Sequence, residues 1–311
     1  LQLVARRYFR SELGQQMQST LSEALPSFVQ LEKILKGYDR RGNFLGLFFT
    51  DAFMLSDFFL IRSFLKWKNT YVVKMEEWMD IVSELDAAVS MADFRYNHPE
   101  ATDAEIVDGS PVLFEAKNLY HPFLGAKAVK NDFSIHDDNY YIITGANMAG
   151  KSTFLRSLGV NYILAMSGMP VFAGSLKVSR FQLFSSMRTT DDLTHGISYF
   201  NAELLRLEQL MQFCKRGNLR TLIILDEILK GTNSLDKLNG SRLFLESISR
   251  MPVTGVIATH DLELSRMAES CPERFHNYCF EIDLGTDVTY TYKIQPGVAG
   301  NQNATFLLNK I

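Results

Sequence analysis

Apolar and polar positions alternate with helical spacing over the first hundred residues. One stretch shows apolar residues at intervals of three and four: Trp78, Ile81, Val82, Leu85, Ala88 and Val89. This periodicity is typical of helices with one apolar face. The turn-like segment 97–103 then interrupts the pattern. We therefore predict an all-α segment over residues 1–105.

A second apolar run lies inside this segment, between Asn43 and Trp67. Its length alone would suit a transmembrane helix. Asp51, Asp57 and Arg62 interrupt the run, and each would cost a few kcal/mol at the centre of a bilayer. We therefore expect a buried helix or helix pair here instead of a membrane span.

The pattern changes after residue 105 to short runs typical of strands. Residues 112–116 and 140–143 are rich in aliphatic and aromatic side chains, which favours buried strands. The run 152–166 then carries apolar residues at the spacing of a helix packed on a sheet. Residues 106–311 are accordingly predicted to form an α/β domain with a mixed, mainly parallel sheet flanked by helices.

The loop between this strand and this helix has the pattern G-x-x-x-x-G-K-[ST], filled by Gly145, Gly150, Lys151 and Ser152. Glycines let such a loop turn its main-chain N–H groups toward phosphates. Lys151 would supply a charge for the β- and γ-phosphates, and the Ser152 hydroxyl can ligate Mg²⁺. The expected nucleotide-binding residues are Gly145, Ala146, Asn147, Met148, Ala149, Gly150, Lys151, Ser152 and Thr153.

Two acids follow a later strand-like run, residues 221–225. Asp226 is expected to hold Mg²⁺ directly or through water. Glu227 is placed to polarise or deprotonate an attacking water. The alternative is a strand that ends in two solvated acids.

A histidine ends the next apolar run, residues 256–258. A lone histidine is usually structural, but His260 follows both earlier elements in order and can be interpreted as a γ-phosphate sensor that orients water. Lys151, Glu227 and His260 are therefore the candidate catalytic residues.

Composition adds little to this interpretation. The chain has 311 residues, 46% hydrophobic and 22% charged, with a net charge of -3 and a pI near 6.1. It has room for two domains, and it lacks the basic excess that would favour nucleic acid. The three cysteines, Cys214, Cys271 and Cys279, have no metal-ligand spacing. They indicate a reduced, cytoplasmic setting.

Several motifs together resemble the ATPase domain of the MutS DNA mismatch-repair family. Asn147 and Met148 match the interior of the family's loop, although Ala146 and Ala149 replace its usual Pro and Gly. The other matching blocks are Tyr120-His121-Pro122, Gly196 to Glu203 with Tyr199 in place of Thr, Asp226 to Asp236, and Thr259 to Leu264.

The resemblance implies a P-loop NTPase of ABC type that binds ATP or ADP with Mg²⁺. In this family two nucleotide domains face each other, so a homodimer is expected. Ser198 would reach, in trans, the γ-phosphate bound by the opposite subunit, unless it is an ordinary helix N-cap. Residues 233–236 would lie in the loop that couples the two sites, unless residues 231–234 form a simple turn.

The implied function is that of the ATP-hydrolysing domain of a MutS-like mismatch repair protein, in which nucleotide-driven dimer closure is coupled to DNA binding. Residues 1–105 would be core and lever material. The first residue is not Met, so we expect a fragment of a longer parent that binds DNA. The family's F-x-E mismatch wedge has no plausible counterpart. The alternative is therefore a nucleotide-gated module that acts on other DNA structures or without DNA, with a membrane anchor in a missing N-terminal region.

Overall fold

A computed structural model describes residues 2–39, 56–109, 111–187, 199–216, 220–229, 233–284 and 288–300. The chain divides into two compact units, Leu1–Asn97 and His98–Ile311. The division lies a few residues before the expected boundary near residue 105. Thr102 belongs to the second unit because its N–H donates to the carbonyl of Val171 at 2.9 Å.

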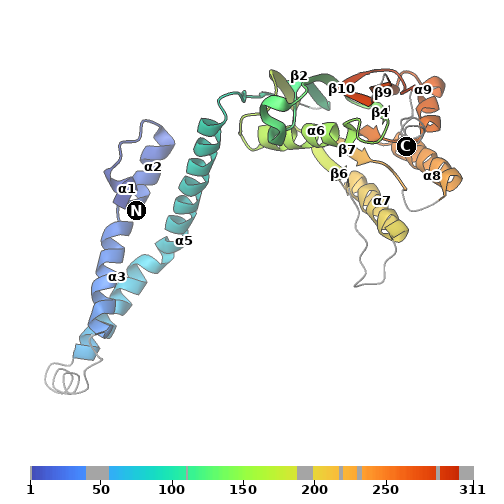
Figure 1. The fold of residues 1–311 in the computed structure, drawn as a ribbon. Coiled ribbons are helices and arrows are strands. Elements are labelled where there is room, and N and C mark those ends of the chain that lie inside the picture. Colours follow the sequence, from blue (N-terminus) through green and yellow to red (C-terminus); the bar gives the residue numbers. More distant parts are fainter. Residues whose placement is uncertain are drawn as a thin grey trace. The chain divides into compact units, whose positions relative to one another are not determined.

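The first unit is helical in its described part. Its helices are α1 (Gln2–Arg6), α2 (Glu12–Leu21), α3 (Ala24–Asp39) and α5 (Ser56–Asn97). Both α2 and α3 pack against the long, curved α5 (Figure 1). Trp67 fixes this packing, since its indole N–H donates to the carbonyl and hydroxyl oxygens of Ser27 at 2.9 and 3.0 Å.

The expected burial of the apolar run 43–67 is only partly confirmed. Residues 43–55 lie outside the described residues. The remainder opens α5, where Trp67 is buried but Phe58 and Leu65 are 59% and 48% exposed. The reason is that α2 and α3 cover only one face of α5. Among the described residues, no helix has the length and apolar character to cross a membrane.

The second unit confirms the predicted mixed α/β fold. Its larger sheet has the strand order β10-β9-β4-β8-β7-β6. The strands are β4 (Tyr140–Gly145), β6 (Gln182–Ser186), β7 (Thr221–Asp226), β8 (Val253–Ala258), β9 (Phe275–Leu284) and β10 (Val288–Pro296). Five of them run parallel, and β10 pairs antiparallel with β9.

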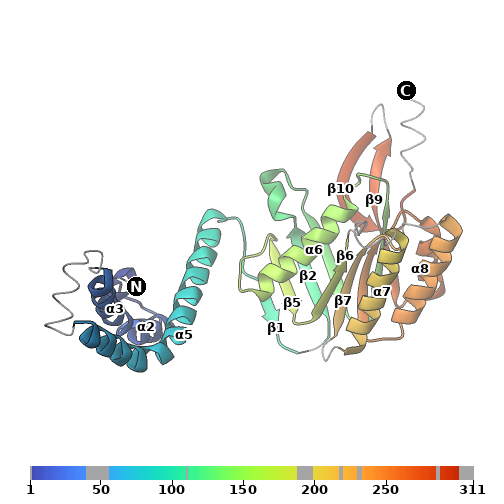
Figure 2. The same cartoon turned by 90° about the horizontal axis from the view of Figure 1, so that it is seen from below.

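A smaller sheet lies beside it, with the strand order β1-β5-β2-β3. Its strands are β1 (Glu105–Val107), β2 (Leu113–Leu119), β3 (Asn131–His136) and β5 (Ser175–Ser179). The connecting helices of the unit are η2 (Pro122–Lys127), α6 (Lys151–Met166), α7 (Tyr199–Arg216), α8 (Ser234–Ile248), η4 (Leu262–Arg266) and α9 (Met267–Ser270) (Figure 2).

Every residue of β4 is buried, because both faces of the larger sheet are covered. Tyr141 and Ile143 pack in one core with α6 and the smaller sheet. Tyr140 and Ile142 point to the other side and pack in a core with α7 and α8. This explains why residues 140–143 are continuously apolar, as expected for a strand buried on both faces.

The register of the parallel strands places the predicted motifs at one edge of the sheet. Ala258 pairs with Ile143 on one side and with Asp226 on the other. The carboxyl ends of β4, β7 and β8 therefore lie side by side, which is where open α/β sheets bind ligands.

Candidate functional site

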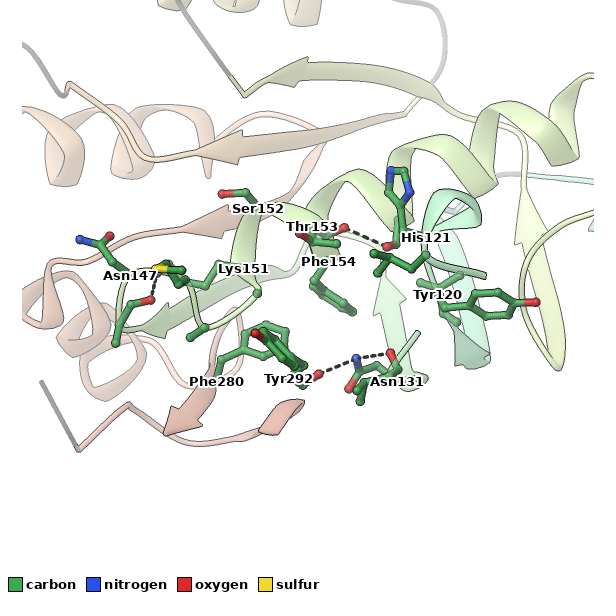
Figure 3. Close-up of a pocket in the computed structure, with 18 of the residues that line it drawn as sticks. Tyr120, His121, Asn131, Asn147, Lys151, Ser152, Thr153, Phe154, Phe280 and Tyr292 are labelled. Carbon is green, nitrogen blue, oxygen red and sulfur yellow. Dashed lines mark hydrogen bonds between the residues drawn. The ribbon is translucent and has the colours of Figure 1, made fainter. Parts of the chain in front are cut away.

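A cavity of about 510 Å³ lies at this edge of the sheet. The loop after β4 and the first turn of α6 form one wall, and the rest includes residues from β2, η2, β3, β9 and β10 together with His260 (Figure 3). Each predicted loop residue from Ala146 to Thr153 lines the cavity. Gly145 ends β4 just before them.

Two glycines allow the close approach of backbone segments at this loop. Gly145 has φ +151°, and a Cβ there would lie 2.9 Å from the carbonyl oxygen of Phe280. Gly150 has φ +110°, and its Cβ would lie 3.1 Å from the Tyr292 ring. Larger residues at either position would close or distort the loop, as the G-x-x-x-x-G pattern requires.

Lys151 begins α6 and is only 6% exposed. Its ammonium donates to the carbonyl oxygens of Gly145 and Ala146, at 2.7 and 2.9 Å. The loop thus folds around a buried positive charge at the N-terminus of a helix. Such a position favours anions, because the positive end of the helix dipole and the N–H groups of the first helical turn both face the site at the N-terminus.

The other loop residues differ in exposure. Ala149 is 1% exposed and packs in the core beside α6, so a methyl group is accommodated where the resembling family has glycine. Ser152 is half-buried, while Asn147 and Thr153 are exposed. Met148 adopts a positive φ of 65° and is 79% exposed. A positive φ is uncommon for a residue other than glycine, and such backbone conformations cluster at functional sites.

His260 follows β8 and meets Lys151 across the cavity. The two imidazole nitrogens lie 3.3 and 3.5 Å from the Lys151 ammonium. One side of His260 is exposed, yet partial burial lowers the pKa of its imidazole, and the Lys151 charge lowers that pKa further. The lowered pKa favours the neutral imidazole, which can accept a hydrogen bond.

Glu227 lies one strand further along the same edge. Its N–H donates to the carbonyl of Ala258 at 2.9 Å, and its φ of 66° is left-handed. Its carboxylate forms an ion pair with Lys237 of α8, and both side chains are largely buried. Asp226 ends β7 and is half-buried.

Part of the predicted site lies outside the described residues, namely Ser198, Gly231 and Thr232. Asn233 is described and caps α8, where its side-chain oxygen accepts the N–H of Asp236 at 3.0 Å. Asn233 is thus the N-cap of α8, and the turn interpretation of residues 231–234 stays a prediction, because Gly231 and Thr232 lie outside the described residues. The trans roles of Ser198 and of this loop remain predictions.

Sequence reasoning missed the aromatic side of the cavity. Tyr292 lines it from β10, at a register irregularity between Tyr290 and Ile294 and with a φ of 53°. Asn131 holds this segment, because its amide donates to the Tyr292 carbonyl at 3.0 Å and accepts from the Ile294 N–H at 2.9 Å. An aromatic face at this position can stack on a nucleobase.

Comparison with known proteins agrees with the geometry. A family model described as MutS domain V matches residues 141–305. The chain is similar to the DNA mismatch repair protein MutS of Staphylococcus carnosus, with 28% identity over 74% of this chain and 27% of the relative. The corresponding proteins of Azorhizobium caulinodans and Acetivibrio thermocellus are 30% and 32% identical over 72% and 71% of the chain. The chain covers 25% and 26% of these two relatives.

The contact between Lys151 and His260 predicts a measurable titration. Replacing Lys151 with Met removes a nearby cation that lowers the pKa of His260, so this pKa should rise in the variant. Histidine ring signals in an NMR pH titration would report this. At pH values between the lowered pKa of His260 in the folded chain and its ordinary pKa of 6.5 in the unfolded chain, the unfolded chain binds more protons than the folded chain. His260 therefore contributes to a loss of stability as the pH falls through this window.

His276 is the internal control for this titration. Burial and His136 lower its pKa, so the Lys151→Met change should leave that pKa unaltered. An unchanged pKa for His260 in the variant would show that the two groups do not interact.

Proposed function

Because the chain belongs to the MutS family, we propose that its second unit is a P-loop NTPase of ABC type that binds and hydrolyses ATP with Mg²⁺. One observation carries the proposal. Lys151 is a buried cation enclosed by a glycine-containing loop at a helix N-terminus, facing a cavity of about 510 Å³. Phosphate groups are the ligands that such a site favours.

The donor set also fits a magnesium ion. Ser152 would supply a hydroxyl oxygen and Asp226 a carboxylate oxygen, both hard ligands that Mg²⁺ prefers. When bound, the ion would neutralise charge on the β- and γ-phosphate oxygens. Tyr292 would stack on the adenine, because its ring lines the same cavity beside Gly150 of the loop.

The proposed hydrolysis uses the acid and the histidine at the ends of β7 and β8. Glu227 would accept a proton from the attacking water, while neutral His260 would orient that water by accepting a hydrogen bond. The Glu227 carboxylate is paired with Lys237. The ion pair would have to open, or the carboxylate would have to contact Lys237 and the water at the same time, before Glu227 accepted the proton from the water.

We propose that two such units face each other when ATP binds, with Ser198 of each reaching the γ-phosphate of the other. Closure and reopening of this homodimer would be transmitted to DNA by the helical unit, as part of MutS-like mismatch repair in a longer parent. The three cysteines are free thiols, which accords with the proposed cytoplasmic location.

A second candidate function keeps the nucleotide site but omits mismatch recognition. The net charge of -3 provides no basic field for DNA, and the sequence shows no plausible F-x-E wedge. In this case the protein would be a nucleotide-gated assembly module acting on other DNA structures or on none, with a membrane anchor in the longer parent.

The catalytic role of Glu227 predicts a separation of binding from turnover. Glu227→Gln should lower ATP turnover about 100-fold or more, because the amide cannot accept the proton. ATP should remain bound and hold the dimer closed. Steady-state phosphate release and filter binding of labelled ATP measure the two effects. The matched variant Glu246→Gln, on α8 and outside the cavity, should behave as wild type. Wild-type turnover in Glu227→Gln would remove Glu227 from catalysis.

DNA binding by the full-length protein distinguishes the two candidate functions. Fluorescence anisotropy with homoduplex, mismatched and branched DNA should show affinity that falls with salt and changes with ATP. Tighter binding to the mismatch supports mismatch repair, and preference for the branched DNA supports the second function. Absence of salt-sensitive binding to all three would exclude a DNA role and leave the ATPase proposal standing.

A further inference from the structure

Lys237 joins the predicted catalytic base to α8. Its ammonium pairs with the Glu227 carboxylate, and the two side chains are only 18% and 19% exposed. Lys237 lies in the first turn of α8, where its N–H donates to the carbonyl of Asn233 at 2.9 Å. Asn233 is the N-cap of this helix. The cation therefore comes from a capped helix end, and the carboxylate is held at that end.

The ion pair holds the side chain of Glu227, whereas other contacts hold its backbone. The Glu227 N–H donates to the carbonyl of Ala258 at 2.9 Å, which ties the residue to the end of β8. The next two residues, Ile228 and Leu229, are buried and pack in the core with α7 and α8. Loss of the ion pair would therefore release the carboxylate and leave the turn after β7 in place.

The paired carboxylate does not face the cavity beside the loop. His260 lines that cavity of about 510 Å³, whereas Glu227 and Lys237, which are both described, do not line it. Glu227 instead lines a separate, much smaller cavity together with Glu203 of α7. An ammonium that oriented the carboxylate for catalysis would have to point it into the larger cavity. The observed position indicates that Lys237 holds the carboxylate back.

The released carboxylate would remain close to the larger cavity. Burial and Lys151 lower the pKa of the His260 imidazole, Glu227 raises this pKa, and Lys237 lowers it. The charges of Glu227 and Lys237 thus act on a side chain that lines the cavity. Because the Glu227 backbone is tied to the end of β8, rotation of its side chain would be enough to bring the carboxylate toward His260.

We propose that Lys237 is a positioning residue that restrains ATP hydrolysis by holding the Glu227 carboxylate at α8, away from the attacking water. This inference rests on the proposed function, since it requires Glu227 to act as the general base. The ion pair then opens in each turnover before the carboxylate can accept a proton. Opening costs free energy, because two largely buried charges lose their partner. The ion pair therefore slows the hydrolytic step.

Single-turnover hydrolysis of labelled ATP tests the proposal, with the full chain and Mg²⁺ in excess over ATP so that product release does not limit the rate. Lys237→Met should raise the hydrolysis rate about fivefold or more, because the carboxylate no longer has to leave a largely buried ion pair. Lys237→Gln should give the same rise. The affinity for ATP should stay unchanged in both, since Lys237 does not line the cavity.

Two further variants are the controls. Lys237→Arg keeps a cation at this position and should hydrolyse ATP at the wild-type rate. Arg242→Met removes another cation from α8, one that is paired with Glu246, and should also match the wild type. A rise in the rate that is confined to neutral residues at position 237 would assign the effect to the ion pair with Glu227.

A double variant separates an action through Glu227 from a general effect on the fold. Lys237→Met/Glu227→Gln should hydrolyse ATP no faster than Glu227→Gln alone, because Lys237 acts only through the carboxylate. An unchanged or lower rate in Lys237→Met, or a rise that persists beside Glu227→Gln, would overturn the inference and leave the ATPase proposal standing. A wild type that does not hydrolyse ATP, or that hydrolyses it without Glu227, would contradict the proposed function and this inference together.

Discussion

The second unit is organised around the buried positive charge of Lys151. The Lys151 ammonium is held by two carbonyl oxygens of the loop that it follows. That arrangement requires Gly145 to lie against the Phe280 carbonyl and Gly150 against the Tyr292 ring. It also requires β4 to be buried on both faces, so that the loop starts from a fixed point. Burying a charge in such surroundings costs folding free energy unless an anion normally pairs with it.

The register of the parallel strands fixes the positions of the other predicted catalytic residues relative to this loop. Because Ala258 pairs with both Ile143 and Asp226, His260 and Glu227 are brought beside the loop from distant parts of the sequence. His260 contacts Lys151 directly, whereas Glu227 is paired with Lys237 of α8. Lys237 follows the segment predicted to couple two subunits. In the proposed mechanism, opening of this ion pair would connect dimer closure to the availability of the Glu227 carboxylate as a general base.

The sequence was sufficient for the parts of the site that one short segment determines. The loop 145–153 and the strand ends at Asp226 and Ala258 are set by local spacing, and their positions could be predicted. Tyr292 could not, because its place depends on an irregularity of β10 and on Asn131, far away in the sequence. The exposure of Leu65 was also missed, since residue types show that a face is apolar but not whether another helix covers it. Figure 3 shows Tyr292 beside Asn131, which holds it in place.

The central claim is that Lys151 forms the core of an ATP site, and calorimetric titration of ATP with Mg²⁺ tests it most directly. The wild type should bind one ATP per chain. Lys151→Met should lose about 100-fold or more in affinity, since the Lys151 ammonium would contact phosphate in the proposed complex. Lys177→Met, which removes an exposed lysine paired with Glu105 on β1, should bind as the wild type does. Equal affinity in the wild type and Lys151→Met would contradict the account.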